Sequence, residues 1–284
     1  RRGILSGFYD LVLPSKAVSC NHTDVILKIM LFESINFSLV FFAFCAGLVD
    51  ATVGGGGLIL VPALMYAYPN LNIATIFGTN KVTALASASS SAFGFIQRVS
   101  IPWKLILPTM GSAFIFAYIG ALSVAYIPKT IMQYAVFVLL IVMAVYTFIK
   151  KDLGKVHTQR HVGTKEIAIG ILFVALIGFY DGVFGPGSGS FFLFLFIKVF
   201  AFDFIHAVAS AKLLNIATFS AALIFFIPAG HVLWAVSFYM MISAMIGALI
   251  GTQLAFKYGS GFIRVFFLVL LIFLIARMGY QLFA

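Results

Sequence analysis

Charged side chains are scarce in this sequence. Asp, Glu, Lys and Arg make up 9% of its 284 residues, against about 25% in a typical soluble domain. Hydrophobic residues make up 63%, which is more apolar surface than one water-soluble core of this size can bury. The composition therefore predicts an integral membrane protein and excludes an ordinary soluble domain.

Cysteines and metal-type clusters are also few. Cys20 and Cys45 are isolated, and no group of Cys, His and acidic residues has the spacing of metal ligands. We therefore expect no metal, no cofactor and no enzyme activity. Basic residues outnumber acidic ones by 18 to 8, but they lie mainly in short connections. That distribution is typical of a membrane topology signal and not of nucleic-acid binding.

Two of the acidic residues lie inside long apolar runs. Asp50 and Asp181 each stand beside a cluster of glycines, in AGLVDATVGGGGLILV and GFYDGVFGPGSGSF. A charged side chain at the centre of a bilayer costs roughly 2.5–3.5 kcal/mol on insertion scales. Two such carboxylates in corresponding surroundings predict a functional site.

The two aspartates belong to a duplicated unit. Asp181 follows Asp50 by 131 positions. The same offset relates Gly47 to Gly178, Gly54 to Gly185, Gly56 to Gly187, Lys81 to Lys212, Trp103 to Trp234 and Gly120 to Gly251. Similar composition alone would not align Asp, Lys and Trp at one spacing. We expect an N-terminal extension (1–33), a first membrane repeat (34–150), a basic linker (151–165) and a second membrane repeat (166–284).

Each repeat contains four apolar segments. In the first repeat they are Ile35–Tyr68, Ile73–Gln97, Trp103–Ile127 and Thr130–Ile149; in the second they are Ile167–Phe200, Phe204–Pro228, Val232–Phe256 and Phe262–Phe283. The first segment of each repeat is broken at its Gly-rich motif, because Gly weakens a helix and Pro removes a backbone donor. The expected fold class is an all-α polytopic membrane protein.

The broken segments decide the direction of the repeats. Ile35–Tyr68 would be about 51 Å long as one helix, against a hydrocarbon core of about 30 Å. If each broken segment crosses once, the repeats are parallel. If it enters and returns, three crossings remain and the repeats are inverted. Basic residues place the linker in the cytoplasm, but Lys257 and Arg264 would face outside in the parallel arrangement, so both arrangements stay open.

The glycine clusters predict a polar site at membrane depth. Non-helical backbone is tolerated there only where protein or a water-filled cavity satisfies it. The N–H groups that start the next half-helix can approach a ligand closely and present the positive end of a helix dipole, which favours an anion. The candidates are Gly55, Gly56, Gly57, Gly187, Ser188 and Gly189. Close helix packing through small residues is the alternative explanation.

Lys81 and Lys212 lie far from the ends of their apolar segments, where snorkelling to the membrane surface is difficult. They can neutralise Asp50 and Asp181 as buried structural pairs. They can equally donate to an anionic substrate, with the aspartates holding them in place or carrying a proton. The two interpretations are compatible.

The segments AGLVDATVGGGGLILVPALM, GTNK, GFYDGVFGPGSGSF and AKLLN resemble the paired signatures of the TauE/SafE-type sulfite exporter family, in its bacterial inner-membrane branch. The resemblance runs from about Met30 to the C-terminus. The family's motifs fall on Asp50 with Gly54–Gly57, Asn80 with Lys81, Asp181 with Gly185–Ser190, and Lys212 with Asn215. The resemblance implies a secondary transporter, expected to export small anions such as sulfite or organosulfonates and to bind them through Lys81, Lys212, Asn80 and Asn215.

Other functions use the same residues. The lysines and the glycine breaks would serve a passive anion channel or a transporter of small carboxylates equally well. An intramembrane serine protease is disfavoured, because Pro186 replaces the first glycine of G-x-S-x-G around Ser188. The expected partners are a small anion, the lipid bilayer and, in a homodimer, a second copy of the chain.

Overall fold

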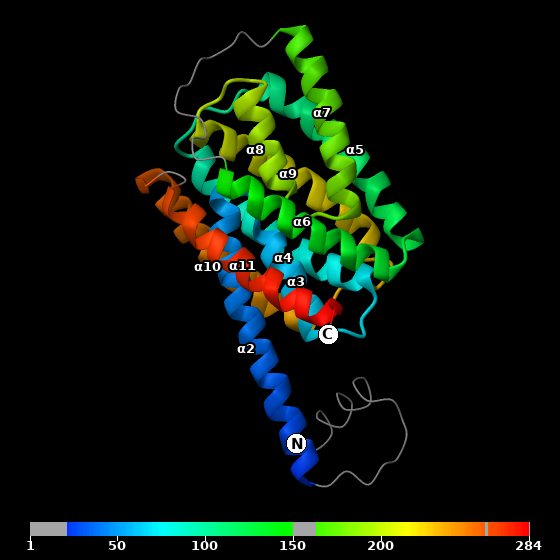
Figure 1. The fold of residues 1–284 in the computed structure, drawn as a ribbon. Coiled ribbons are helices and arrows are strands. Elements are labelled where there is room, and N and C mark those ends of the chain that lie inside the picture. The colour runs from blue at the N-terminus through cyan, green and yellow to red at the C-terminus, as the bar shows by residue number, and fades with distance from the viewer. Residues whose placement is uncertain (1–21, 150–162, 259–260, 284) are drawn as a thin grey trace, which may run out of the picture. The chain divides into compact units, whose positions relative to one another are not determined.

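The computed structural model describes residues 22–149, 163–258 and 261–283. Within these ranges the chain forms ten α-helices, one short 3-10 turn and no strand, as Figure 1 shows. The elements are α2 (His22–Val53), α3 (Gly56–Ala67), α4 (Ile73–Ile96), α5 (Trp103–Ser123), η1 (Val124–Tyr126), α6 (Lys129–Ile149), α7 (Thr164–Val183), α8 (Ser188–Lys198), α9 (Phe204–Phe226), α10 (Trp234–Tyr258) and α11 (Gly261–Phe283). The expected all-α fold class is confirmed.

Most helices begin and end close to the apolar segments expected from the sequence. Side-chain caps fix the starts of two helices. At α4 the Asn72 side chain accepts a hydrogen bond from the Ala74 N–H, and at α9 the Asp203 side chain accepts one from the His206 N–H. α2 differs, since it begins at His22, well before the apolar run. Apolar side chains mark the part of a helix that meets lipid, whereas backbone hydrogen bonds can extend the helix beyond it. The chain divides into two units, Arg1–Phe37 and Ser38–Ala284, and all contacts described below lie within the second.

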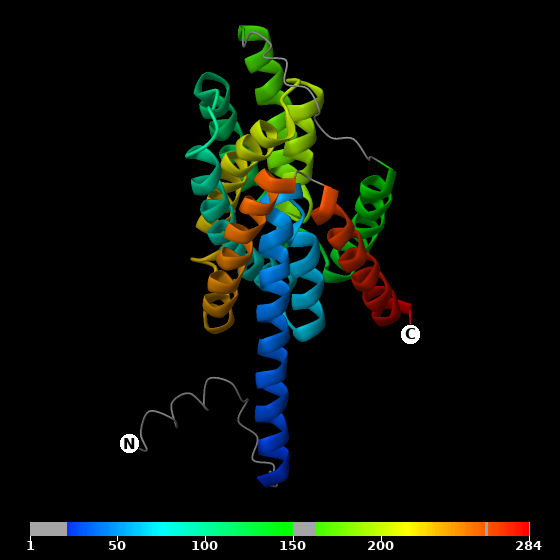
Figure 2. The ribbon, with the colours of Figure 1, turned by 90° about the vertical axis from the view of Figure 1, so that its left-hand side faces the viewer.

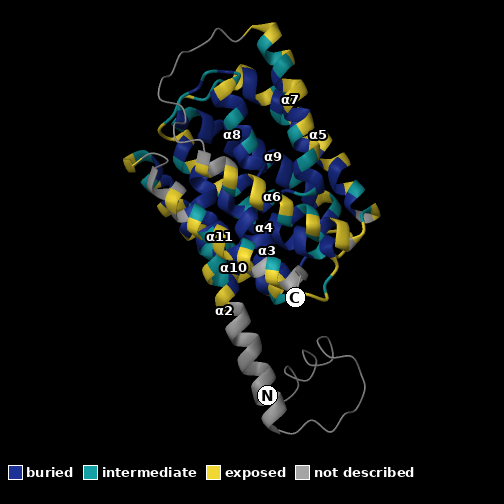
Figure 3. Cartoon of the chain, viewed as in Figure 1, coloured by how far each residue is buried: buried dark blue, intermediate teal, exposed yellow. Residues whose placement is uncertain are grey.

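The outer helices expose large apolar side chains. Four helices, α5, α7, α9 and α10, are long and apolar enough to cross a membrane. Leu107 on α5, Leu172 on α7 and Phe238 on α10 are all exposed, and Figure 3 shows many exposed positions on these helices beside a mostly buried α9. Apolar surface of this extent is explained by contact with lipid. α9 therefore lies inside the bundle, and α5, α7 and α10 face the bilayer.

α2 and α10 run in the same direction. The Ser243 hydroxyl of α10 donates to the Val40 carbonyl oxygen of α2 at 2.7 Å, and Gly251 lies against Leu48 two turns further along both helices. Residue numbers therefore rise together along the contact. Figure 2 shows the same upward course for α2 and α10.

α4 runs in the same direction as α10 and opposite to α9. At the start of α10, the Leu233 N–H donates to the Thr79 hydroxyl of α4 at 3.0 Å, and near the other end Gly94 of α4 lies against Thr252 of α10. Along α9 the order is reversed, because Gly78 lies against Phe226 whereas Lys81 lies against Phe219. The two central helices are thus antiparallel.

α5 and α7 form a second parallel pair. The Ser112 hydroxyl of α5 donates to the Ile171 carbonyl oxygen of α7 at 3.1 Å, and further along Gly182 of α7 lies against Ala117 of α5. α5 follows α4 after a short connection, so it crosses back. α5 and α7 therefore run opposite to α2 and α4, in the direction of α9.

These directions show how the broken segments are folded. α2 and α4 run the same way, so α3 must bring the chain back between them, and α8 does the same between α7 and α9. α3 has 12 residues and α8 has 11, or about 17 Å each, which is shorter than the roughly 30 Å hydrocarbon core. Each broken segment enters and returns, which favours the inverted arrangement over the parallel one.

Among the residues whose exposure the structure describes, the exposed basic side chains gather at one end of the bundle. Arg98, after α4, stacks on the Phe256 ring near the end of α10, 5.0 Å from its centroid. Gly170, early in α7, packs against both Leu105 at the start of α5 and Phe200 after α8. The ends of α4, α8 and α10 and the starts of α5 and α7 therefore lie at the same end of the bundle. The residues of this basic end are Arg98, Lys104, Lys165, Lys198 and Lys257.

Candidate functional site

The two helix breaks have matching backbone geometry. Gly54 follows α2 with φ +73°, and Gly185 follows α7 with φ +83°. Gly187, which precedes α8, has φ +84°. This left-handed region is accessible to glycine without steric cost and disfavoured for other residues. The glycines therefore let the chain reverse direction within a few residues.

The two breaks lie directly against each other. Gly54 contacts the backbone of Gly189, so closely that a side chain on either residue would collide with the other. The Ser190 hydroxyl donates to the Val53 carbonyl oxygen, at the end of α2, at 2.6 Å. Gly57, in the first turn of α3, lies next to Pro186. The N-terminal ends of α3 and α8 consequently meet where the two halves of the chain cross.

Each buried lysine pairs with the aspartate of the other half. The Lys81 ammonium lies 2.6 Å from a carboxylate oxygen of Asp181, and the Lys212 ammonium lies 2.7 Å from one of Asp50. All four side chains are at most 8% exposed. Removing one partner of such a pair typically costs 3–5 kcal/mol, because the other charge is left uncompensated. Each pair therefore links the two halves at their crossing and leaves neither buried charge uncompensated.

Two asparagines lie at the starts of the half-helices. The Asn80 amide faces Gly57 of α3, and the Asn215 amide faces Gly189 of α8. Among the described residues, neither polar atom of the Asn215 amide has a hydrogen-bond partner, and Asn80 Oδ1 and Asp181 Oδ2 also lack one. A buried polar atom without a partner costs about 1–3 kcal/mol. Such atoms at one point mark a place where a ligand can supply the missing contacts.

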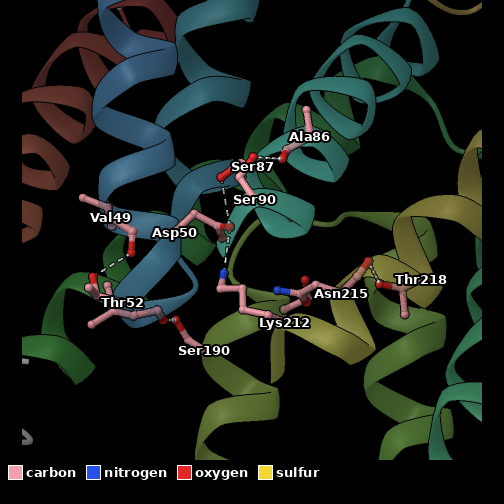
Figure 4. A network of polar contacts seen from close by, with 12 residues as sticks. Val49, Asp50, Thr52, Ala86, Ser87, Ser90, Ser190, Lys212, Asn215 and Thr218 are labelled. Carbon is pink, nitrogen blue, oxygen red and sulfur yellow. Dashed lines mark hydrogen bonds and ion pairs between the residues drawn. The ribbon is translucent and has the colours of Figure 1, made fainter. Parts of the chain in front are cut away.

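The structure brings most of the expected site residues together. Ser188 donates to Asp181 at 2.8 Å, and Figure 4 shows Lys212 between Asp50 and Asn215. We call this group the polar centre. It consists of Asp50, Asn80, Lys81, Ser87, Asp181, Ser188, Lys212 and Asn215, with the first turns of α3 and α8.

Two of the expected glycines, Gly55 and Gly56, have an additional packing role. A side chain on Gly55 would meet the Phe267 ring of α11, and one on Gly187 would meet apolar atoms of Leu58. Gly56 lies against Asp50. Neighbouring groups thus leave no room for a side chain on Gly55 or Gly56, which is the small-residue packing given as the alternative, whereas Gly187 is required only by its backbone conformation.

Two residues of the site were missed by sequence reasoning. The Tyr180 hydroxyl donates to the Pro186 carbonyl oxygen at 2.6 Å, and the Phe219 ring lies 4.6 Å from the Lys81 ammonium. The residues 131 positions earlier are Val49 and Ala88, which have neither a hydroxyl nor a ring. Comparing the two halves therefore gave no signal for either residue.

The helices and the polar centre define a polytopic membrane protein with paired charges at membrane depth. The model of the family described as "Sulfite exporter TauE/SafE" matches residues 39–278. The chain belongs to this family of membrane transporters.

Curated bacterial relatives agree with this assignment. "Probable membrane transporter protein YfcA" of Escherichia coli K12 is 32% identical over 243 residues, which are 86% of this chain and 89% of the relative. "Probable membrane transporter protein ORF9" of a Sinorhizobium species is 34% identical over 237 residues, 83% and 89% of the two chains. "Probable membrane transporter protein" of Haemophilus influenzae is 29% identical over 251 residues, 87% and 97% of the two. No solved structure matches the chain.

Proposed function

We propose that this protein is a secondary transporter that exports small sulfur-containing anions, such as sulfite or organosulfonates, through the polar centre. The observation that carries the proposal is the meeting of two half-helix N-termini with two buried lysines at one crossing point. Helix N-termini and lysine ammonium groups both favour negative charge. The Asn215 amide nitrogen, a buried donor without a partner among the described residues, supplies a further contact for an anion there.

Sulfur oxyanions fit this set of donors. Sulfite and sulfonate groups carry three oxygens that accept hydrogen bonds in several directions, and amide N–H and ammonium groups donate to such acceptors. Backbone N–H groups at a glycine-rich turn can approach the oxygens closely because no side chain intervenes. The family name, which describes sulfite export, supports the same substrate class.

Because the charges of the polar centre are already paired, anion binding is proposed to require protonation of an aspartate. Each lysine is already neutralised by an aspartate, so a bare anion would meet no net positive charge. Binding becomes favourable when one aspartate takes up a proton, because its lysine then needs a new partner. Asp50 and Asp181 are thus proposed to hold the lysines between cycles and to couple transport to protons.

Uptake by purified protein in liposomes tests the proposal. We expect sulfite and methanesulfonate to accumulate against a concentration gradient when a proton gradient is imposed, and Lys212→Met to abolish this uptake. Acetate and sulfate serve as competitors. Flux that only follows the substrate gradient would instead indicate a passive channel, and uptake of acetate alone would indicate a carboxylate transporter.

We further propose that the protein lies in a bacterial plasma membrane with the basic end in the cytoplasm. Positive residues are enriched in cytoplasmic connections. The linker 150–165, expected to be cytoplasmic, lies largely outside the described residues, but the helix that follows it begins at the basic end. Lys257 lies at that end as well, which removes the conflict that the parallel arrangement created.

A further inference from the structure

The two Lys–Asp pairs of the polar centre are equivalent by sequence offset but not by structure. We propose that they divide the work of transport: the pair Lys81–Asp181 stays closed and holds the helix break, whereas the pair Lys212–Asp50 opens when Asp50 is protonated from the basic end. This inference rests on the proposed function and adds which half of the polar centre responds to proton and anion.

Lys81 has a structural partner that Lys212 lacks among the described residues. The Lys81 ammonium donates to the Asp181 carboxylate and also to the Asp181 backbone carbonyl oxygen, at 2.7 Å. That carbonyl lies in the last turn of α7, where carbonyl groups have no partner within the helix and a cation is favoured. In the first half the corresponding carbonyl, that of Asp50, is bonded instead by the Gly54 N–H at 3.2 Å. Lys81 therefore closes the end of a broken helix.

The Lys81 pair is also fully enclosed. Phe219 covers the ammonium, and Ser188 donates to the same Asp181 oxygen that Lys81 binds. The Asp181 side chain is 0% exposed. Its second oxygen has no hydrogen-bond partner among the described residues. Opening this pair would break several contacts at once.

The Lys212 pair is held by fewer contacts. Lys212 makes one bond to Asp50 at 2.7 Å, and the Ser87 hydroxyl adds a long contact of 3.5 Å, as Figure 4 shows. The Asp50 side chain is 8% exposed. Lys212 of α9 is the charged group that contacts Asp50, while α4 contributes Ser87 and α3 contributes Gly56, which do not titrate. Asn215, with its unpartnered amide, lies beside this pair.

A row of hydroxyls leads from Asp50 toward the basic end. Ser91 lies one turn beyond Ser87 on the same face of α4, and Thr252 of α10 lies against Gly94, a further turn along. The hydroxyls of Ser91 and Thr252 are buried and have no partner within the described part of the chain. Water can satisfy buried hydroxyls that lack a protein partner. The row therefore provides a polar route to Asp50.

The positions equivalent to this row do not repeat it. The residue equivalent to Ser87 is Thr218, whose hydroxyl donates to the Asn215 carbonyl oxygen at 3.1 Å. The residues equivalent to Ser91 and Thr252 are Ala222 and Ala121, which carry no hydroxyl. The row of Ser87, Ser91 and Thr252 therefore has no counterpart at the equivalent positions near Asp181.

The charge balance follows from this geometry. A proton from water at the basic end binds the Asp50 carboxylate, which becomes a neutral acid. The Lys212 ammonium then loses its ionic partner, and the pair carries one net positive charge. One monoanion bound to Lys212 and to the Asn215 amide restores neutrality, so one proton accompanies each monoanion.

Cysteine labelling tests the hydroxyl row without requiring transport. In a variant with Cys20→Ser and Cys45→Ala, Ser91→Cys and Ala222→Cys place a thiol at equivalent, equally buried positions. We expect a small water-soluble methanethiosulfonate to label Ser91→Cys at least about ten-fold faster. Equal rates, or faster labelling of Ala222→Cys, would overturn the inference. Failure of the proposed substrates would not affect this result.

Paired neutral variants test the division between the two pairs. Lys212→Met with Asp50→Asn, and Lys81→Met with Asp181→Asn, each remove both charges and so leave no buried charge unpaired. We expect the first variant to keep a wild-type Tm and lose methanesulfonate uptake. The second should lower Tm by about 5 °C or prevent folding, because the end of α7 loses its donor. The reverse pattern, or the same Tm in both variants, would contradict the proposal.

Discussion

At the scale of single residues, Asn215 is the least satisfied polar side chain of the polar centre, because both of its amide atoms are buried without a partner among the described residues. Leu has nearly the same volume and needs no hydrogen bond. We expect Asn215→Leu to raise stability by about 1 kcal/mol, since an unsatisfied group is removed. It should lower the affinity for methanesulfonate at least ten-fold.

Thermal unfolding and uptake kinetics of the purified variant measure both effects. Asn72→Leu is the matched control, because this asparagine already has a partner: it caps α4 through a 3.0 Å bond from the Ala74 N–H. Loss of that cap should cost about 1 kcal/mol and leave affinity unchanged. If Asn215→Leu were destabilising and transported normally, Asn215 would have only a packing role.

The proposed proton uptake by Asp50 predicts that transport depends on pH. A proton on Asp50 releases Lys212, so anion binding strengthens as the pH at the basic end falls and weakens as it rises. Methanesulfonate stays a monoanion throughout the usable pH range. Any pH dependence of its transport therefore comes from the protein and not from the substrate. Asp50→Asn, which resembles the protonated acid, should bind the anion with little pH dependence. A pH profile that persists in Asp50→Asn would place the coupling site elsewhere.

The members of the site could be predicted residue by residue, but not their partners. The constant offset identified Asp50, Asp181, Lys81 and Lys212 as equivalent pairs. The offset shows which residues occupy corresponding positions in the two halves. It does not show whether a lysine pairs with the aspartate of its own half or with that of the other half. That choice depends on how the halves cross, which involves contacts distant in sequence. The covering ring of Phe219 lies outside the offset pattern altogether.

At the scale of helices, the close parallel pairs depend on positions without side chains. On α7, Gly182 packs so tightly against α5 that a β-carbon would collide with the Ala117 carbonyl oxygen. Small residues at such contacts let membrane helices approach closely. We expect Gly182→Ala to separate α5 from α7 and to lower Tm strongly or prevent recovery of folded protein in detergent.

Gly111 on α5 offers the matched control for this change. Nothing lies within 4 Å of the position where its β-carbon would be, and Ala is a better helix former than Gly by about 1 kcal/mol. Gly111→Ala should therefore leave Tm unchanged or raise it. Fluorescence-detected chromatography after heating compares the two variants directly. Similar Tm values for both would show that the α5–α7 contact tolerates an added methyl group.

Helix bounds could be predicted well because apolar runs, glycines and prolines mark them locally. α4 begins at Ile73, as the sequence predicts. The path through the breaks could not be predicted in the same way, since a glycine cluster permits both a kinked crossing and a reversal. The contacts of α2 and α4 with α10 resolve that path, because they show that both helices run in one direction.

At the scale of the whole chain, the opposed directions of the two halves distribute the tryptophans and the basic residues. Trp103 starts α5 at the basic end and Trp234 starts α10 at the other, and both are exposed. Tryptophans are enriched at both membrane surfaces. Sequence charges alone left the direction undecided, because the assignment of Lys257 to one side depends on the number of crossings before it.

The position of the C-terminus tests this topology. α10 ends at the basic end, and α11, with 23 residues, is about 34 Å long and reaches the opposite side. If the basic end is cytoplasmic, alkaline phosphatase fused after Ala284 should be active in the periplasm and green fluorescent protein at the same site should be dark. A fusion after Lys257 is the control and should behave oppositely. The reverse pattern would invert the proposed orientation.

The backbone contact between Gly54 and Gly189 limits how the molecule can move. No side chain separates the two hairpins there, so neither can slide past the other without a collision of main chains, whereas rotation about the contact is free of that obstacle. Alternation between inward-open and outward-open forms would then be a rocking motion with its pivot at this point. Spin labels in the turns at 68–72 and 199–203 should change their separation during the cycle, while labels beside the pivot should keep theirs.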